Sequence, residues 1–519
     1  MTVPLIDLLR ADLASANYSV TALTGLWGVE ADAALHRNQR VPALRALKAL
    51  RQKLGRPERS ATLAQLFVLG LPVTRADLDA ALPTLGTTGA LELGLVEPDT
   101  APDLLRPLLD LRPYSFIDAQ GAGSWWIASD LGELALGHAL GENHVLGVGG
   151  ASLTLAGLVL PNPVSSALDL GTGCGIQAMH AARHADRVVA TDISERALEL
   201  AALNARLNGI TNIEFRLGSL FEPVAGERFD HIISNPPFVI TPRTEGVPSY
   251  EYRDGGLVGD AIVEAVVTGA AAHLTPGGVA QLLGNWEYRT NVDAFDRMTA
   301  WLDRPESGNL DAWIIEREVE LPTEYAETWI RDGGTRPDTP DFDRLYGAWL
   351  DDFAARNVAK VGFGYMLLRA PVEGPAASAA PFRRLERLLG SLGQNSSGLG
   401  TYLAECLAAH DWQAATNDDA LSRAHLIVAP DVTEERHYWP GNDDPTLMTL
   451  HQGAGFGRTV PLDTALAALI GACDGDLSVA AIIGALSQLL EVDEDALTAD
   501  LLPRLRELLD DGFLRAPSE

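Results

Sequence analysis

The sequence predicts an α/β protein in which a doubly wound, largely parallel sheet forms the centre of the chain. Within residues 146–370, short apolar runs alternate with amphipathic segments, which is typical of a parallel sheet covered by helices. A glycine-rich turn follows the first of these runs and leads into a predicted helix, as in folds that bind nucleotides at a sheet edge. At 519 residues the chain also exceeds what one core accommodates, so we expect about two to four domains.

The expected architecture is a central seven-stranded Rossmann-like sheet between two smaller domains. The N-terminal domain is predicted to be mainly helical, and the C-terminal domain to be α+β and winged-helix-like. The domain boundaries are placed at residues 1–145, 146–370 and 382–519, with a linker at 371–381.

The composition is that of a globular protein. Hydrophobic residues make up 47% and charged residues 21% of the chain, close to the averages for soluble domains. The three cysteines, Cys174, Cys406 and Cys473, lie far apart, which argues against a disulfide framework or a zinc site. Residues 1–10 lack the features of a signal peptide, and no uncharged apolar run is long enough to span a bilayer. We expect a cytoplasmic protein without a metal and without membrane contact.

The net charge of −31 is unevenly distributed along the chain. A strongly acidic surface weighs against broad nucleic-acid binding, because phosphate contacts need basic residues. Residues 36–59, however, hold eight Lys or Arg residues and one Glu. This basic segment is interpreted either as the solvated face of a helix or as a patch that contacts the backbone of RNA.

Residues 1–145 are predicted to be mostly helical. Apolar residues recur at spacings of three and four in residues 5–16, 41–54 and 62–69, the pattern of amphipathic helices. A further helix is expected to begin after Thr74, whose hydroxyl can cap it, with Asp77 at the third position beyond the cap. Extended segments are expected at 91–96 and 124–128, and helices followed by a short β-ribbon suggest a winged-helix-like module.

Residues 146–370 are predicted as seven strands with helices between most of them. The helices are expected at 176–183, 195–208, 260–273 and 292–301, and a polar, partly helical insert at 325–356 separates the last two strands. The strands are expected at 167–170, 188–192, 213–217, 229–234, 279–284, 312–319 and 358–368.

The remaining residues begin with the predicted linker, where small residues and Pro occur without periodicity. Beyond it we expect helices near 383–392 and 399–409 and a strand at 425–430. Three helices at 463–473, 479–490 and 495–509, followed by a strand at 512–514, resemble a winged helix, a fold that contacts nucleic acid or protein.

The turn after the first central strand is a candidate cofactor site. Its sequence is Asp169-Leu170-Gly171-Thr172-Gly173-Cys174-Gly175. Glycines permit backbone conformations closed to other residues and let a ligand approach the main chain. The free amides at the start of the next helix suit a carboxylate or a phosphate. Dinucleotide folds use the spacing GxGxxG, whereas this turn has GxGxG with an acid two residues ahead.

A second acid supports a cofactor site. Asp192 ends the second predicted strand, about twenty residues beyond the turn, where an acid accepts hydrogen bonds from ribose hydroxyls. The alternatives are a tight turn without a ligand and a nicotinamide-dependent enzyme. A second motif, after the fourth strand, argues against the nicotinamide enzyme.

That motif is Asn235-Pro236-Pro237-Phe238. A base amine or a carboxamide nitrogen is a poor nucleophile because its lone pair is delocalised. The side-chain oxygen of Asn235 and the carbonyl of Pro236 can accept hydrogen bonds from its two hydrogens, orient the lone pair and stabilise the developing positive charge. The two prolines fix the backbone, and Phe238 offers a face for stacking a flat substrate. A Pro-Pro turn without a catalytic role is the alternative.

With both motifs, residues 146–290 resemble the small-domain class I S-adenosylmethionine-dependent methyltransferases. This group includes release factor glutamine methyltransferases and guanine-N2 ribosomal RNA methyltransferases. The resemblance implies S-adenosylmethionine as the cofactor and N-methylation as the activity. It implies Asn235, Pro236, Pro237 and Phe238 as catalytic residues, with Asn235 also facing the cofactor. The implied cofactor-binding residues of the turn and of the second strand end are Asp169, Gly171, Thr172, Gly173, Cys174, Gly175, Asp192 and Ile193.

Three further contacts are implied where the chain departs from the family pattern or matches it less closely. Many members have an acid that binds the adenine amine, and here Ser219 and Leu220 stand at that place. Residues 147–155 are similar to the segment that covers the methionine end, so Thr154 is the implied partner of the methionine carboxylate.

The resemblance divides between two branches. Residues 252–260 are similar to the glycine-rich segment of the glutamine methyltransferases, whereas Phe238 and residues 283–285 are more similar to the ribosomal RNA group. We favour methylation of a planar amine on an RNA base, with ribosomal RNA as the expected substrate and the basic segment as its docking site. The alternative is a protein glutamine methyltransferase of the release-factor type, and a third possibility is a binding module without catalysis. The expected partners are RNA or a protein, with possible contact to the ribosome or a translation factor.

Overall fold

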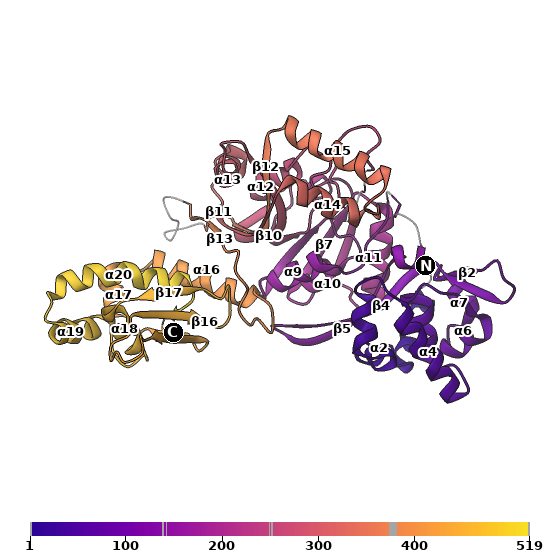
Figure 1. Ribbon diagram of the computed structural model, residues 1–519, viewed down its shortest axis with the longest axis horizontal. Helices are drawn as coiled ribbons and strands as arrows, with labels where there is room; N and C mark the ends of the chain where they lie inside the picture. The colour runs from indigo at the N-terminus through magenta and orange to yellow at the C-terminus, as the bar shows by residue number, and fades with distance from the viewer. Residues whose placement is uncertain are drawn as a thin grey trace.

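The structure is a computed structural model that describes residues 3–136, 140–141, 143–248, 250, 253–372 and 381–516. A mixed sheet lies at its centre, between the N-terminal and the C-terminal regions (Figure 1). Within the described residues this sheet has eight strands in the order β13-β11-β12-β10-β9-β6-β7-β8. The predicted α/β class and the central Rossmann-like sheet are confirmed.

The parallel half of the sheet contains the first five central strands. Their apolar runs are buried, as Leu168 and Ile232 show with exposed fractions of 0% and 1%, because helices cover both faces. The strands are β6 (Val164–Leu170), β7 (Ala185–Asp192), β8 (Ile213–Leu217), β9 (Phe229–Ser234) and β10 (Leu274–Arg289). The helices are α9 (Gly150–Leu158), α10 (Ile176–Ala181), α11 (Glu195–Leu207), α12 (Ala261–His273) and α13 (Ala294–Leu302), with short 3₁₀ turns η2 (Glu222–Val224) and η3 (Pro305–Ser307). The sequence analysis does not predict α9.

The other half of the sheet corrects two predictions. β12 (Val358–Arg369) lies antiparallel between β10 and β11 (Asp311–Glu320), and β13 (Arg383–Arg387) adds parallel to β11. The expected count of seven strands is therefore too low by one, and the helix expected near 383–392 is a strand over its first half. The apolar spacing in this segment is helical, but the free edge of β11 offers unpaired backbone groups, and pairing with them decides the conformation.

The insert between β11 and β12 is a helical hairpin. It contains α14 (Pro322–Asp332) and α15 (Pro340–Ala355), each with Pro in its first turn, where the missing amide costs no helical hydrogen bond. Tyr325, Trp349 and Phe353 form its buried face. The hairpin thus covers one end of the sheet (Figure 1).

The N-terminal region begins with helices, as predicted. Thr74 caps α6 by accepting a hydrogen bond from the amide of Asp77 at 3.1 Å. The extended segment expected at 91–96 is wrong over most of its length, because α7 continues to Glu92 and β2 begins only at Val96. The elements are α1 (Val3–Ser15), α2 (Val20–Trp27), α3 (Val29–Leu35), α4 (Val41–Leu54), α5 (Arg59–Leu63), the π-helix η1 (Ala64–Val68), β1 (Val73–Thr74), α6 (Arg75–Ala81), α7 (Gly86–Glu92), β2 (Val96–Pro98), β3 (Leu104–Pro107), β4 (Leu109–Asp118), β5 (Gly121–Asp130) and α8 (Glu133–Leu136).

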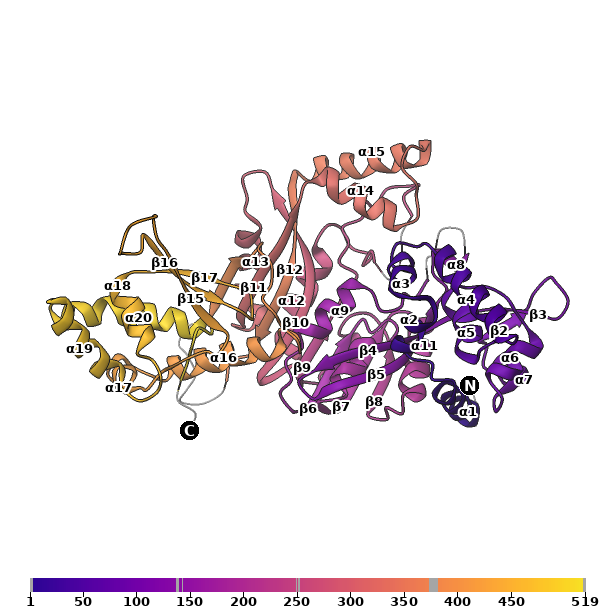
Figure 2. The same cartoon turned by 60° about the horizontal axis from the view of Figure 1, so that its bottom comes forward.

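The hairpin of β4 and β5 joins the N-terminal region to the central one, and it lies beside the parallel strands in Figure 2. Asn204 on α11 donates to the carbonyl of Ala128 at 2.9 Å, and Asn208 donates to the carbonyl of Trp126 at 2.8 Å. The buried side chains of the N-terminal helices form one hydrophobic cluster with residues of α10 and α11. The two regions therefore share a core.

The C-terminal region combines helices with small sheets. The strand expected at 425–430 is confirmed in part by β14, and the three terminal helices are confirmed. The elements are α16 (Gly400–Ala414), α17 (Asp418–Arg423), β14 (Ile427–Val428), β15 (Val432–His437), β16 (Leu447–Gln452), β17 (Thr459–Leu462), α18 (Thr464–Gly471), α19 (Val479–Leu490), α20 (Glu494–Asp510) and β18 (Leu514–Arg515). The winged-helix-like description of both flanking regions and the domain boundaries stay predictions, and most of the expected linker lies outside the described residues.

The described ranges contain no helix that is both long and apolar enough to cross a bilayer. They also contain no group of three or more His, Cys, Asp or Glu side chains arranged to hold a metal ion.

Candidate cofactor and acceptor site

A cavity of about 600 Å³ opens at the carboxyl ends of β6, β7 and β9. This edge is where open α/β sheets bind ligands, and the volume lies in the range of small-molecule sites. The cavity wall includes the start of α9, the turn after β6, the ends of β7 and β8, the motif after β9, the loop before α12 with part of that helix, and α14 of the insert.

The glycine turn after β6 has the backbone that its sequence predicts. Gly171, Gly173 and Gly175 have φ angles of +78°, +54° and +87°, which other residues rarely adopt. A Cβ atom on Gly175 would lie 2.9 Å from that of Ala201, so this glycine allows α10 to pack against α11. Gly171 and Gly173 have open space where a Cβ would stand, and both line the cavity together with Thr172 and Cys174.

Asp169 stabilises the turn through hydrogen bonds. Its Oδ2 accepts hydrogen bonds from the Thr172 hydroxyl at 2.6 Å and from the Ala178 amide at 2.8 Å. The carboxyl group is fully buried, and burial raises its pKa to about 7. Asp169 and Gly175 are not among the described residues that line the cavity. They shape the turn, whereas Thr172 and its neighbours face the ligand space.

Asp192 ends β7 beside the turn. Its two carboxylate oxygens accept hydrogen bonds from the amides of Gly173 and Ser194, both at 2.9 Å. Burial raises the pKa of this carboxyl above its usual range. The next residue, Ile193, is 65% exposed and lines the cavity. A carboxylate beside an open apolar side chain suits a ribose with its attached base.

The remaining predicted cofactor residues are placed unequally. Ser219 and Leu220 line the cavity, and Leu220 has a φ angle of +47°. Thr154 lies in the second turn of α9 and is not among the described lining residues, whereas Ala151 and Ser152 in the first turn are. Burial raises the pKa of the Cys174 thiol to about 11, so this side chain stays protonated and acts as a small apolar group.

Asn235 is held at the end of β9. The hydroxyl of the preceding Ser234 donates to the carbonyl of Leu170 at 2.8 Å and ties β9 to β6. The Oδ1 atom of Asn235 is buried and has no hydrogen-bond partner among the described residues. A buried acceptor without a donor is costly, so this oxygen is prepared for a donor that enters the cavity.

Phe238 lines the cavity but is only 7% exposed. Its ring packs against Phe363 on β12, with the two centroids 5.6 Å apart. The side chain therefore supports the cavity wall and leaves little ring surface for stacking. Pro236 and Pro237 line the cavity between Phe238 and Asn235.

A loop after the motif closes the far wall of the cavity. Asp254 accepts hydrogen bonds from the Thr241 hydroxyl and from the Tyr250 amide, both at 2.7 Å. It also accepts one from Nε of Arg253 at 2.9 Å. Arg253 is 5% exposed, lies over the Tyr250 ring, and donates to the carbonyl of Trp329 at 2.8 Å. The glycine-rich segment expected at 252–260 is thus bound to the insert, although Tyr252 lies outside the described residues.

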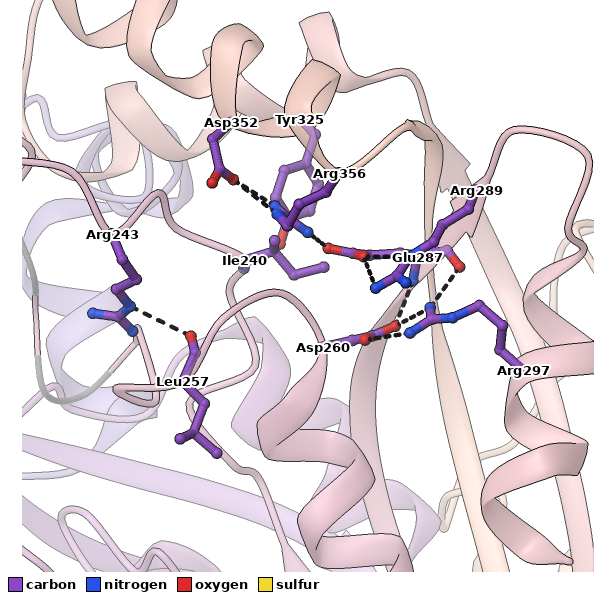
Figure 3. A network of polar contacts seen from close by, with 10 residues as sticks. All are labelled: Ile240, Arg243, Leu257, Asp260, Glu287, Arg289, Arg297, Tyr325, Asp352 and Arg356. Atoms are coloured by element: carbon purple, nitrogen blue, oxygen red, sulfur yellow. Dashed lines mark hydrogen bonds and ion pairs between the residues drawn. The ribbon is translucent and has the colours of Figure 1, made fainter.

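A network of buried charges holds the back of this loop (Figure 3). Asp260 accepts a hydrogen bond from the amide of Glu287 at 2.9 Å and forms an ion pair with Arg297. Glu287, which is fully buried, forms ion pairs with Arg289 and with Arg356 from the end of α15. These pairs connect the start of α12, β10, α13 and the end of α15.

The tertiary structure adds residues to the cavity that the sequence motifs do not predict. Trp329 and Asp332 come from α14, and Gln177 comes from α10. Gln177 stands two residues after the last glycine of the turn, as a polar residue in an otherwise apolar helix start, and this pattern is a signal that could have indicated it. No local pattern distinguishes Trp329 from a core tryptophan.

Comparisons with known proteins agree with this geometry. Residues 149–293 match the methyltransferase small domain family. Residues 15–107 and 404–516 match two families described as domains of unknown function, DUF7059 and DUF7782.

Curated relatives match the same central region. A release factor glutamine methyltransferase of Xylella fastidiosa is 39% identical over 127 residues, which are 23% of this chain and 46% of the relative. A ribosomal protein uL3 glutamine methyltransferase of Bradyrhizobium diazoefficiens is 36% identical over 173 residues, 31% of this chain and 53% of the relative. The chain thus spans about half the length of the curated relatives it matches.

Solved structures show low overall similarity. A methyltransferase from Pyrococcus furiosus is 18% identical with a TM-score of 0.24, covering 40% of this chain and 76% of that one. A 16S rRNA N2 methyltransferase from T. thermophilus, solved with AdoMet and guanosine, is 21% identical with a TM-score of 0.25, covering 41% and 55%.

The central region is therefore a class I S-adenosylmethionine-dependent methyltransferase domain. It belongs to the methyltransferase small domain family and is related to the release factor and uL3 glutamine methyltransferases. The residues present fit the cofactor. Open backbone at Gly171 and Gly173, the carboxylate of Asp192 and the exposed Ile193 suit the parts of a nucleoside, and the unpartnered Asn235 oxygen lies in the same cavity.

Proposed function

We propose that this protein transfers a methyl group to the side-chain amide nitrogen of a glutamine residue in a protein substrate. The observation that carries the proposal is the buried, unpartnered Oδ1 of Asn235 in a cavity that also contains the cofactor turn. The named activity of the curated relatives, glutamine methylation, supports the same acceptor.

The residues of the motif orient the acceptor nitrogen. Oδ1 of Asn235 accepts a hydrogen bond from one N–H of the carboxamide, and the carbonyl of Pro236 accepts one from the other. This pair of acceptors turns the nitrogen lone pair toward the cofactor and stabilises the positive charge that develops on the nitrogen. S-Adenosylmethionine, when bound, would supply the methyl group, with S-adenosylhomocysteine as the leaving group and the extra proton of the methylated nitrogen passing to solvent. The two rigid prolines keep both acceptors in place without offering a competing N–H donor.

Three observations support a protein acceptor over the RNA base that the sequence analysis favours. Phe238 is packed against Phe363 and has little free ring surface, so it offers no stacking platform. The net charge of −31 opposes contact with phosphates. In the basic segment, Arg51 and Arg59 pair with Asp77 and Asp12 of the same chain, which uses part of its charge internally.

We expect the insert to be the part of the cavity wall that determines the choice of acceptor. α14 lies beyond residue 293, outside the matched family region, yet Trp329 and Asp332 line the cavity. Substrate choice by this enzyme therefore depends on residues that lie outside the region matched by the family model. We infer that the flanking regions supply contacts to the rest of the protein substrate.

Labelling with tritiated S-adenosylmethionine tests the proposal. The protein is incubated with lysate from cells that lack its gene, and the product is divided for digestion with protease or RNase. Label that is released by protease and survives RNase supports the proposal, and mass spectrometry then finds the methyl group on a glutamine. Label lost to RNase overturns it in favour of an RNA base.

A matched pair of variants controls this experiment. Asn235→Ala removes the acceptor oxygen, whereas Asn442→Ala changes an exposed asparagine of the C-terminal region that is not among the described lining residues. Label must disappear with the first variant and remain with the second. Equal labelling by both would show that the signal does not come from this site.

A further inference from the structure

Gln177 presents an unused acceptor to the cofactor half of the cavity. Its side chain is 3% exposed and lines the cavity from the first turn of α10. Its Oε1 atom is buried and has no hydrogen-bond partner within the described ranges. Such an atom, like Oδ1 of Asn235 in the same wall, indicates that a ligand supplies the missing donor.

The orientation of this amide is determined by its other end. Nε2 of Gln177 donates a hydrogen bond to the carbonyl of Ser152 at 2.7 Å. Since a carbonyl only accepts, the nitrogen must face Ser152 and the oxygen must face the other way. A flipped amide would bring two oxygens together, so Nε2 faces Ser152 and Oε1 is the atom that lacks a partner among the described residues.

The start of α9 lies beside this amide group, which donates to the carbonyl of Ser152. α9 begins at Gly150 after the N-cap Gly149, and no side chain caps it. The amides of Gly150, Ala151 and Ser152 precede the first residue that can bond within the helix, and all three residues line the cavity. These amides are donors and suit an anion, whereas Gln177 offers an acceptor and suits a cation.

We infer that Gln177 binds the α-ammonium group of the methionine part of the cofactor while the first turn of α9 binds its α-carboxylate. The α-carbon of S-adenosylmethionine carries both charged groups. They can therefore reach an acceptor and a set of donors that lie next to each other in the cavity wall. Thr154, which lies one turn further along α9 and away from the lining residues, takes no part in this contact. The inference concerns the cofactor half of the site and holds for a protein or an RNA acceptor.

Binding measurements with two nucleoside ligands test the inference without turnover. S-Adenosylhomocysteine carries the amino-acid end, and 5′-methylthioadenosine lacks it. In the variant Gln177→Met, which keeps the length of the side chain, the affinity for S-adenosylhomocysteine should fall roughly ten- to one-hundred-fold, the effect of losing a hydrogen bond to a charged group. The affinity for 5′-methylthioadenosine should stay within about twofold, as calorimetry can establish.

Gln281→Met is the matched control. Gln281 is also a buried glutamine, but its Oε1 accepts from the amide of Leu160 at 2.8 Å and its Nε2 donates to the carbonyl of Leu158. It braces the other end of α9 and is not among the described residues that line the cavity. This variant should leave the ratio of the two affinities unchanged.

Two results would overturn the inference. Unchanged binding of S-adenosylhomocysteine to Gln177→Met would mean that the ammonium group is held elsewhere. An equal loss for both ligands would mean that Gln177 only supports the packing of α9 on α10. If Gln177→Met does not fold, Gln177→Glu retains an acceptor oxygen for the ammonium group but loses the donor to Ser152. The ratio of the affinities for S-adenosylhomocysteine and 5′-methylthioadenosine should then stay near the wild-type ratio or rise, and a tenfold fall in this ratio would also contradict the inference.

Discussion

The hydroxyl group of Tyr325 accepts a hydrogen bond from the backbone amide of Ile240 at 3.0 Å. Tyr325 belongs to α14 of the insert, and Ile240 lies two residues beyond Phe238. The same hydroxyl is bonded to the side-chain amide of Asn285 on β10. One buried phenol therefore connects the insert, the sheet and the acceptor motif, and Figure 3 shows this contact beside the charged network.

Tyr325→Phe is expected to destabilise the protein by about 1–3 kcal/mol, because a buried amide loses its acceptor. The methylation rate should fall as well, since the chain after the motif is no longer fixed. Urea denaturation and turnover measure the two effects. Tyr346→Phe is the control, because its hydroxyl makes only a 3.4 Å contact with Glu327. Equal effects of both substitutions would contradict a special role for Tyr325.

Asn235→Ala is expected to bind S-adenosylhomocysteine with the wild-type affinity and to lose about 10²–10³-fold in turnover, as when one transition-state hydrogen bond is removed. Oδ1 has no partner within the described chain, so its removal should cost no stability. Calorimetry and single-turnover methylation check the two statements. Turnover above a tenth of the wild-type rate would exclude Asn235 from the orientation of the acceptor nitrogen.

Asp192→Ala should weaken binding of S-adenosylhomocysteine by about 1.5–3 kcal/mol, the value of a hydrogen bond to a charged group. Its carboxylate also holds the amide of Gly173, so the turn loses part of its order. Asp186→Ala changes an exposed acid on the same strand and should leave the dissociation constant unchanged. Indistinguishable constants for the two variants would place the ribose elsewhere.

Asp169 makes stability depend on pH. Burial raises the pKa of its carboxyl to about 7 in the folded state, from 3.8 for the free side chain. The folded state therefore holds the proton more tightly, and its contribution to stability is present below pH 3.8 and is lost as the pH rises toward 7. Asn at position 169 does not ionise, so Asp169→Asn should not lose this stability as the pH rises. Its side-chain oxygen can still accept hydrogen bonds from Thr172 and Ala178.

As the pH rises from 3.8 to about 7, the unfolding free energy of Asp169→Asn should therefore increase relative to that of the wild type. Denaturant titrations at several pH values measure it, and the contributions of all other groups cancel in the difference. A difference that is constant with pH would falsify the raised pKa.

Arg297→Met should be strongly destabilising, by about 3–5 kcal/mol, because it leaves the buried Asp260 without its charge partner. The side chain of Arg297 is 14% exposed and that of Asp260 is 3% exposed. Arg331→Met breaks the exposed pair with Glu327 on α14 and should cost less than about 1 kcal/mol. Similar denaturation midpoints for the two variants would contradict the structural role of the network in Figure 3.

Much of the site follows from local sequence. The GxGxG turn, Asp192 and the Asn235 motif each stand directly after a predicted strand, and parallel strands end at one edge of a sheet. Their convergence could thus be predicted, and the cavity contains residues of all three. Thr154 shows the limit of this reasoning. Successive residues of a helix point in directions about 100° apart, so which residues of α9 face the cavity depends on where the helix begins. The position of that start depends on packing and could not be located from the sequence.

By itself the sequence determined the parallel half of the sheet, the turn and the acceptor motif, because apolar periodicity, glycine and proline act over a few residues. Only the tertiary structure decided that residues 383–387 pair with β11 as β13, that α14 brings Trp329 to the cavity wall, and that Oε1 of Gln177 has no donor among the described residues. Each of these outcomes depends on contacts between segments that are far apart in the sequence. Such contacts are a property of the whole fold rather than of any one segment.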